Sequence, residues 1–140
     1  MITQWFISAP HNLWRFWAEW RRKARWLQEQ RKATDDARKT RGIVLLREWL
    51  SPEQRAQFDQ FRYFEVNGCD TGSRYRIGYG TGTNIHEMNS EGHPIMGWCF
   101  VPSGPLVAGD VMLAQKIALE TNERAALAIA NRFTISRSSS

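Results

Sequence analysis

The chain has 140 residues, with a hydrophobic fraction of 42% and a charged fraction of 24%, values typical of one small globular domain. Its net charge of +5 is concentrated at one end: residues 1–41 hold ten Lys and Arg against four Asp and Glu, whereas residues 42–140 hold nine against ten. This composition excludes a disordered chain, and two cysteines exclude the disulfide framework of a small secreted protein. The low cysteine count leads us to expect a reducing, cytoplasmic compartment. No apolar run approaches the roughly 18–20 residues of a membrane span.

Residues 10–33 are predicted to form one long amphipathic helix. At about 100° per residue, one narrow arc collects the apolar side chains Leu13, Phe16, Trp17, Trp20, Ala24 and Leu27. Arginine and glutamate side chains take the opposite side of this helix. Residues 33–42 lose the apolar stripe, so we expect a linker or a solvated helix end there, closed by Gly42 as a C-terminal cap.

Two further helices are predicted before the first strand. Residues 43–50 place leucine and tryptophan side chains at helical spacing, although Ile43 and Val44 would also suit a strand. The tetrapeptide Ser51-Pro52-Glu53-Gln54 has the order of a capping box, with serine as N-cap, proline at the first helical position and glutamine at the third. The helix that follows is expected over residues 52–62, with Phe58 and Phe61 turned to one side.

From Tyr63 the apolar period changes from 3.6 residues to 2, which predicts antiparallel strands. Four strands are expected, near residues 63–67, 74–79, 83–88 and 95–101. The last of them is apolar on both faces, which is typical of a central strand.

Two helical segments are predicted after the strands. Asp110 is expected to cap an apolar helix that must be buried. An alanine-rich helix is expected to start at Thr121 or Asn122 and to end near Phe133; alternatively, the two segments form one helix of about 24 residues.

The predicted fold class is therefore α+β. A four-stranded antiparallel meander packs against the C-terminal helices and the helix at 52–62, preceded by the long N-terminal amphipathic helix. The predicted organisation is a basic, tryptophan-rich helix and linker at 1–41, one small α+β domain at 42–135 and a disordered tail at 136–140.

The N-terminal helix is the main candidate for function. Tryptophan and arginine contribute most binding energy at protein interfaces, and an amphipathic helix can lay its apolar side into a groove. We therefore expect a non-enzymatic binding or assembly protein that docks a protein partner or a second copy. The predicted partner-binding residues are Leu13, Phe16, Trp17, Trp20 and Leu27. The same stripe can also pack against the protein's own sheet, with the arginines solvated.

Two alternatives remain open for this helix and its arginines. A nucleic-acid-binding protein would pair phosphates with guanidinium groups and stack bases on aromatic rings. The predicted contacts for that function are Arg21, Arg22, Lys23, Arg25, Arg74 and Arg76. A peripheral protein at an anionic membrane surface would place its indole rings at the level of the headgroups. Segregation of the aromatic and basic side chains on different sides favours packing over nucleic-acid binding.

The sequence gives weaker evidence for a metal site or a catalytic site than for a binding helix. Cys69, His86, His93 and Cys99 have the residue types of a Cys2His2 zinc site, but no C-x-x-C spacing anchors them. Asp70-Thr71-Gly72 has the order found in aspartic proteases, but it follows a turn instead of an apolar strand, which indicates a turn. We expect no cofactor and no metal. If the protein is an enzyme, Asp70, His86 and Cys99 are the residues to consider.

One resemblance covers about half of the chain. Its residues are the strand Arg74-Tyr75-Arg76-Ile77, the segment Cys99-Phe100-Val101-Pro102, and the run Gly109-Asp110-Val111-Met112-Leu113-Ala114-Gln115-Lys116 with Leu119-Glu120. In these residues the chain resembles a group of small uncharacterised bacterial proteins, over roughly residues 63–131. The resemblance implies a bacterial protein in which the sheet and final helices form a recurring module. It carries no activity.

Overall fold

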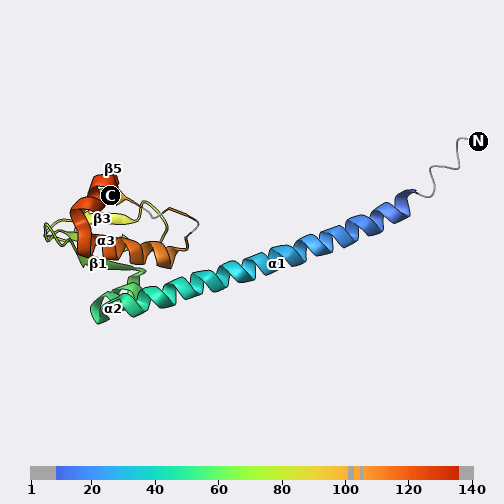
Figure 1. The fold of residues 1–140 in the computed structure, drawn as a ribbon, viewed down its shortest axis with the longest axis horizontal. Helices are drawn as coiled ribbons and strands as arrows, with labels where there is room; N and C mark the ends of the chain where they lie inside the picture. Colours follow the sequence, from blue (N-terminus) through green and yellow to red (C-terminus); the bar gives the residue numbers. More distant parts are fainter. Residues whose placement is uncertain (1–8, 101–102, 105, 136–140) are drawn as a thin grey trace, which may run out of the picture. The chain divides into compact units, whose positions relative to one another are not determined.

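The computed structural model describes residues 9–100, 103–104 and 106–135. The predicted tail at 136–140 lies outside the described residues. Along the chain the elements are α1 (Ala9–Trp49), α2 (Pro52–Phe61), β1 (Tyr63–Asn67), β2 (Arg74–Gly78), β3 (Ile85–Met88), β4 (Pro94–Cys99), α3 (Ala108–Ile129) and β5 (Asn131–Phe133) (Figure 1). The chain divides into two compact units, Met1–Ala37 and Arg38–Ser140, so that α1 begins in the first unit and ends in the second. The predicted boundary at residue 41 stays a prediction.

The first helix is longer than the sequence predicts. One helix spans Ala9–Trp49, so the segments predicted as helices at 10–33 and 43–50 are continuous. Residues 33–41 between them are helical and exposed, which agrees with the predicted solvated helix and not with the alternative of a linker. Gly42 does not cap a helix end, because it lies buried inside α1. A Cβ atom added to Gly109 of α3 would lie 2.3 Å from the carbonyl carbon of Gly42. These two glycines therefore let the backbones of α1 and α3 come into contact, which explains why neither position carries a side chain.

The second helix begins as predicted. Ser51 Oγ accepts a hydrogen bond from the Gln54 N–H at 3.2 Å, and Gln54 Oε1 accepts one from the Ser51 N–H at 3.1 Å, which completes the capping box. The helix ends at Phe61, and Arg62 adopts the left-handed conformation with φ of 62°. Phe58 is buried, whereas Phe61 is 52% exposed, so these two rings do not share a buried side.

The sheet has five antiparallel strands in the order β1-β2-β3-β4-β5, which confirms the predicted meander but adds a strand to it. Residues 131–133, predicted as the end of a helix, form β5 and pair with β4. The central strand is therefore β3, and β4 has neighbours on both sides without lying at the centre. Ile95 on β4 is 52% exposed, so its apolar side chain does not mark a buried face.

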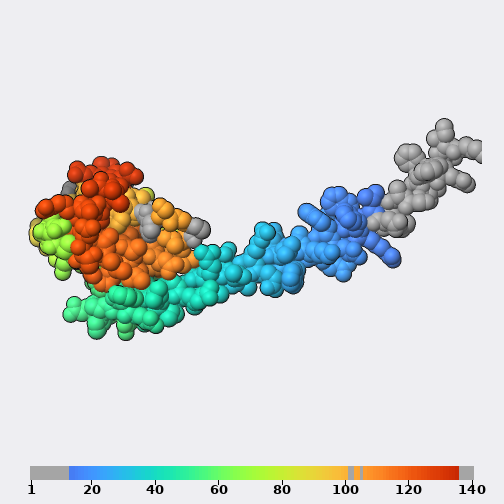
Figure 2. Space-filling model, viewed as in Figure 1, coloured from blue at the N-terminus to red at the C-terminus, as the bar shows by residue number. Residues whose placement is uncertain are grey.

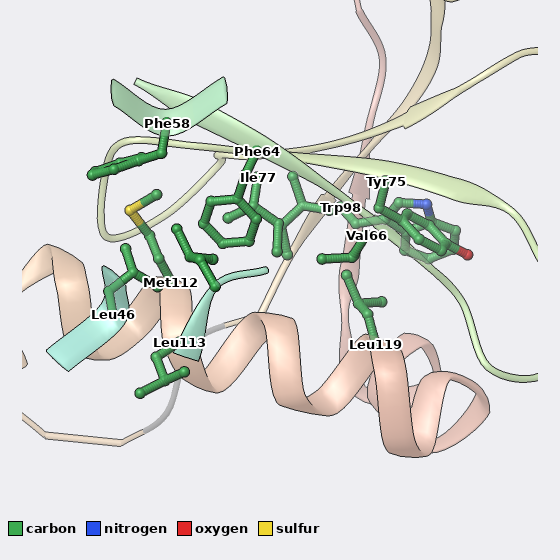
Figure 3. Packing of buried hydrophobic residues seen from close by; sticks show 12 residues of the cluster. Leu46, Phe58, Phe64, Val66, Tyr75, Ile77, Trp98, Met112, Leu113 and Leu119 are labelled. Carbon is green, nitrogen blue, oxygen red and sulfur yellow. The ribbon is translucent and has the colours of Figure 1, made fainter. Parts of the chain in front are cut away.

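One hydrophobic core holds the sheet, α2, α3 and the end of α1 together (Figure 3). The sheet and the helices contribute buried side chains to it, among them Leu46, Phe58, Phe64, Val66, Ile77, Met112 and Leu119. A buried amide pair joins the sheet to α3: Asn84 Nδ2 donates to Gln115 Oε1 and Gln115 Nε2 donates to Asn84 Oδ1, each at 2.9 Å. Because both amides also donate to backbone carbonyls, neither leaves a donor of its NH2 group unpaired in the core.

The last helix differs from its prediction at both ends. It begins at Ala108 after the N-cap residue Val107, which makes no side-chain cap, so Asp110 lies inside the first turn and does not cap the helix. One helical run extends to Ile129, but Asn122 has non-helical torsion angles (φ −153°, ψ 51°) and kinks it. The kink falls at the point where the sequence predicts a second helix to start.

Candidate functional site

The predicted interaction residues of the first helix form an exposed apolar strip. Leu13, Phe16, Trp17, Trp20 and Leu27, here named the tryptophan face, are each 49–63% exposed. Edge-to-face contacts join the rings of Phe16, Trp17 and Trp20, with centroids 6.5 and 6.1 Å apart. A hollow of about 350 Å³, lined by Trp14, Trp17, Ala18 and Arg21, borders this face. In the space-filling view, side chains stand out along this part of α1 (Figure 2).

The predicted basic residues belong to different units of the chain. Arg21, Arg22, Lys23 and Arg25 are exposed on α1 in the first unit, and Arg74 and Arg76 lie on β2 in the second. Within the second unit, Arg76 Nη2 lies 3.1 Å from Glu65 Oε1 and Arg74 Nε lies 3.7 Å from Glu65 Oε2. The Glu65 carboxylate therefore forms ion pairs with both guanidinium groups.

The sheet face opposite α3 carries polar and aromatic side chains. The strand register places Glu65, Arg76, His86 and Gly97 side by side on β1 to β4, with Phe133 of β5 beside Gly97. The Phe133 ring covers Gly97, since a Cβ atom there would lie 2.0 Å from the ring. Burial, followed by the charge of Arg76, lowers the pKa of His86 from its ordinary value. The imidazole is therefore neutral at neutral pH.

A groove of about 470 Å³ lies on this sheet face. We call it the aromatic–arginine groove; its lining includes Phe61, Arg62, Tyr63, Arg76, Tyr79 and His86. The Phe61 and Tyr63 rings are stacked with centroids 5.2 Å apart. The guanidinium carbon of Arg76 lies 4.1 Å from the Tyr63 centroid, and that of Arg62 lies 4.6 Å from the Tyr79 centroid.

A buried carboxylate fastens the turn between β1 and β2 to α3. Glu123 is 0% exposed and accepts hydrogen bonds from the N–H of Asp70 at 2.8 Å, from the N–H and hydroxyl of Thr71, and from the Tyr75 hydroxyl at 2.7 Å. Gly68 makes room for it, because a Cβ atom at residue 68 would lie 2.2 Å from Glu123 Cδ. The Asp70-Thr71-Gly72 segment is thus a turn, as predicted, and it holds this carboxylate.

The same turn starts the second part of α3. Asp70 Oδ2 accepts a hydrogen bond from the Arg124 N–H at 2.9 Å, and Cys69 Sγ accepts one from the Glu123 N–H at 3.4 Å. These two N–H groups follow the kink at Asn122 and would otherwise be the unpaired donors of a helix start. The turn therefore caps the helix, and the helix supplies the carboxylate that orders the turn.

The pKa values of this cluster follow from its contacts. Burial alone would raise the pKa of Glu123, but the hydrogen bonds from Thr71, Tyr75 and the backbone outweigh it and lower the pKa below the ordinary value of 4.5. Burial, together with the hydrogen bond to Glu123 and its charge, raises the pKa of Tyr75. The pair is a carboxylate and a neutral phenol at neutral pH, which suits an anchor and not an acid–base catalyst.

The cluster does not suit a metal ion. Within the described residues, Cys69, Asp70 and Glu123 are the one group whose three ligand atoms lie within 4.8 Å of one another. Each ligand group already accepts hydrogen bonds, four of them on Glu123, so an ion would have to displace the contacts that hold the turn. Of the predicted zinc ligands only Cys69 belongs to this group; His86 is on β3, His93 in the β3–β4 turn and Cys99 at the end of β4.

Comparison with known proteins assigns neither a family nor a function to the chain. No family model, curated protein or solved structure matches the chain. The resemblance over residues 63–131 therefore stays a prediction. In the part of the chain that the structure describes, no helix combines the length and apolar character that crossing a membrane requires.

Sequence reasoning missed most of the groove and the anchor. A signal for the groove was present, because period-2 alternation places Tyr63 and Glu65 on the same face, as it does Arg74 and Arg76. The roles of Arg62 and Tyr79 depend on the left-handed turn after α2, which the sequence does not mark. Glu123 gave no signal, since a glutamate near a helix start is ordinary on an exposed surface.

Proposed function

We propose that the protein is a non-enzymatic assembly protein that binds a second copy of itself through the tryptophan face. One observation carries this proposal: five large apolar side chains lie on one side of a helix and remain about half exposed. Exposed apolar patches of this kind mark interaction sites in soluble proteins. Their three aromatic side chains are 53–63% exposed and can therefore still bury roughly 250–450 Å² per copy, a large part of the roughly 800 Å² of a standard interface.

The spacing of the face supports a second copy as its partner. When two such helices lie antiparallel with the two Trp20 side chains at the centre, facing residue numbers add up to 40. Leu13 then faces Leu27, and the large ring of Phe16 faces the small Ala24. A surface whose residues pair reciprocally in this way is what a twofold symmetric interface requires. Large-against-small pairing lets the side chains interdigitate.

Charged side chains at the border of the face suit the same arrangement. Lys23 lies at the border of the tryptophan face, and Glu19, one helical turn earlier, lies further toward the opposite side of the helix. Antiparallel pairing about Trp20 brings Glu19 of one copy level with residue 21 of the other, about 3 Å along the helix from Lys23. Lys23 of one copy therefore lies near Glu19 of the other along the helix axis, while Arg15 and Arg25 lie toward the opposite side of the helix.

Light scattering of the 140-residue chain tests the proposal. We expect a dimer at micromolar concentration for the unchanged chain. The double variant Trp17→Ala/Trp20→Ala should be monomeric, because truncating one buried interface tryptophan costs about 2–4 kcal/mol. Trp26→Ala is the matched control: this tryptophan is 58% exposed but lies outside the stripe, so the variant should remain dimeric.

Cysteine cross-linking tests the orientation. In a background with Cys69→Ser and Cys99→Ser, a mixture of Leu13→Cys and Leu27→Cys chains should give the mixed disulfide, and each variant alone should give little cross-linked product. An unchanged chain that is monomeric, or a double tryptophan variant that assembles as well as the unchanged chain, contradicts self-association. A monomeric chain that binds vesicles containing anionic lipid would instead identify the membrane-surface function.

A further inference from the structure

We propose that the aromatic–arginine groove binds a nucleotide unit, that is, a base next to a phosphate, either as a free nucleotide or within a single strand. This inference does not rest on self-association through the tryptophan face, since the groove lies entirely within the second unit. A volume of about 470 Å³ falls in the range of small-molecule sites, about 300–1,000 Å³, and exceeds what a phosphate ion alone occupies.

The charge of the groove favours an anion. Two guanidinium groups, those of Arg62 and Arg76, line it, and no carboxylate is among its described lining residues. None of the five ion pairs within the described ranges includes Arg62. Arg76 shares the Glu65 carboxylate with Arg74, so its charge is only partly balanced.

A hydrogen-bond donor at the groove has no partner. Arg76 Nε is buried and makes no hydrogen bond within the described part of the chain, although its Nη2 donates to Glu65 Oε1 at 3.1 Å. A buried donor without a partner destabilises the protein, and a phosphate oxygen is a strong, charge-assisted acceptor for a guanidinium N–H. The groove therefore offers a phosphate the positive charge of Arg76, and the buried Nε donor would gain an acceptor only if the guanidinium turned toward the ligand.

Its aromatic walls favour a base beside that phosphate. Phe61 and Tyr79 are 52% and 47% exposed. Each ring already contacts one planar group of the protein: Phe61 stacks on Tyr63, and the Arg62 guanidinium lies over Tyr79. A base can stack on the exposed part of such a ring, whatever its sequence identity, because every base has a flat π-face. Inorganic phosphate would leave these walls uncovered, and a neutral apolar ligand would leave the guanidinium charges of Arg62 and Arg76 without an anion.

Binding assays with the whole chain test this site. The probes are AMP, a fluorescein-labelled ten-nucleotide single strand of DNA, and inorganic phosphate. The groove variants are Arg62→Asn, which retains a residue type that tolerates the left-handed conformation, and Tyr79→Ala. The matched control is Arg132→Ala, because Arg132 also lies over an aromatic ring, 5.0 Å from the Trp98 centroid, but lines a different cleft. Thermal melting verifies that each variant is folded.

We expect AMP or the single strand to bind the unchanged chain and the Arg132→Ala variant alike. Affinity should fall at least tenfold in Arg62→Asn and in Tyr79→Ala. Equal affinity per site for AMP and the strand identifies a free nucleotide as the ligand; a strand that binds more than a hundredfold tighter identifies single-stranded nucleic acid.

Three results would overturn the site. The first is no binding of AMP or the strand at millimolar protein. The second is phosphate that binds as tightly as AMP. The third is strand binding that survives both groove variants and disappears when Arg21, Arg22, Lys23 and Arg25 are replaced by glutamine, since that places the contact on α1.

Discussion

Glu123 shows how one residue can hold a turn and a helix start together. A buried carboxylate is costly unless hydrogen bonds replace the water it has lost. Here two backbone N–H groups and two hydroxyl groups replace that water, and the donors come from the turn between β1 and β2 and from β2. The charge is therefore a structural component, and its removal should disturb the turn as well as the helix.

Replacement of Glu123 should destabilise the protein in a pH-dependent way. Glu123→Gln puts an NH2 group against donors that need an acceptor, and we expect a loss of about 2–4 kcal/mol in the free energy of unfolding at pH 7. Because the pKa of Glu123 is lower in the folded than in the unfolded chain, its contribution is present above the ordinary value of 4.5 and disappears as the pH falls through the folded pKa. Urea unfolding at a series of pH values measures both effects.

The direction in which the stability gap changes with pH is the result that tests the role of the Glu123 charge. The gap in stability between the unchanged chain and Glu123→Gln should shrink as the pH is lowered from about 5 to about 3. Glu91→Gln is the control, because Glu91 is exposed in the β3–β4 turn and should alter stability by less than about 0.5 kcal/mol. A gap that stays constant over this range would show that the carboxylate charge contributes nothing.

At the scale of elements, the contact between α1 and α3 depends on two glycines. Gly109→Ala should destabilise the protein by at least about 1–3 kcal/mol, because its Cβ atom would lie 2.3 Å from the Gly42 backbone and the helices must separate. Gly82→Ala is the matched control: its Cβ atom would meet Cys99 Sγ at 3.9 Å, an ordinary contact. Thermal or urea unfolding measures both, and equal stability of the two variants would refute a close helix contact.

Elements whose signals are local could be predicted from the sequence. The capping box at Ser51 and the alternation of Phe64 and Val66 depend on neighbouring residues, and both are confirmed. β5 could not be predicted, because three residues are too few to show a period, and Phe133 is placed by Gly97, more than thirty positions earlier in the chain. Similarly, Gly42 resembles a cap until its distant neighbour Gly109 is known.

The candidate sites also differ in whether they depend on neighbouring or on distant residues. The tryptophan face could be predicted because it lies within one helix, whose period fixes which side chains are neighbours. The aromatic–arginine groove combines Arg62 at the end of α2 with side chains of β1, β2 and β3. Its assembly depends on strand register and on the left-handed conformation of Arg62, which one-dimensional patterns do not contain.

For the whole molecule, all described residues of the hydrophobic core lie in the second unit, at or after Leu46. We therefore expect a chain lacking residues 1–37 to fold, with a free energy of unfolding within about 0.5 kcal/mol of the monomeric Trp17→Ala/Trp20→Ala variant. Comparison with that variant removes any contribution from assembly. Urea unfolding measures the difference, and a truncated chain that fails to fold would show that the first unit supports the core.

The late position of α3 in the chain has a consequence for synthesis. Thirty residues separate Cys99 at the end of β4 from Ile129 at the end of α3, since 129 minus 99 is 30. At about 5–20 residues per second, a ribosome needs roughly 2–6 seconds to add them. During that interval the apolar face of the meander, with Phe64, Ile77 and Trp98, can pack against α2 and the end of α1 but lacks its cover by α3. Nascent chains are therefore at their most prone to aggregate, and most in need of a chaperone, after β4 has emerged and before α3 is complete.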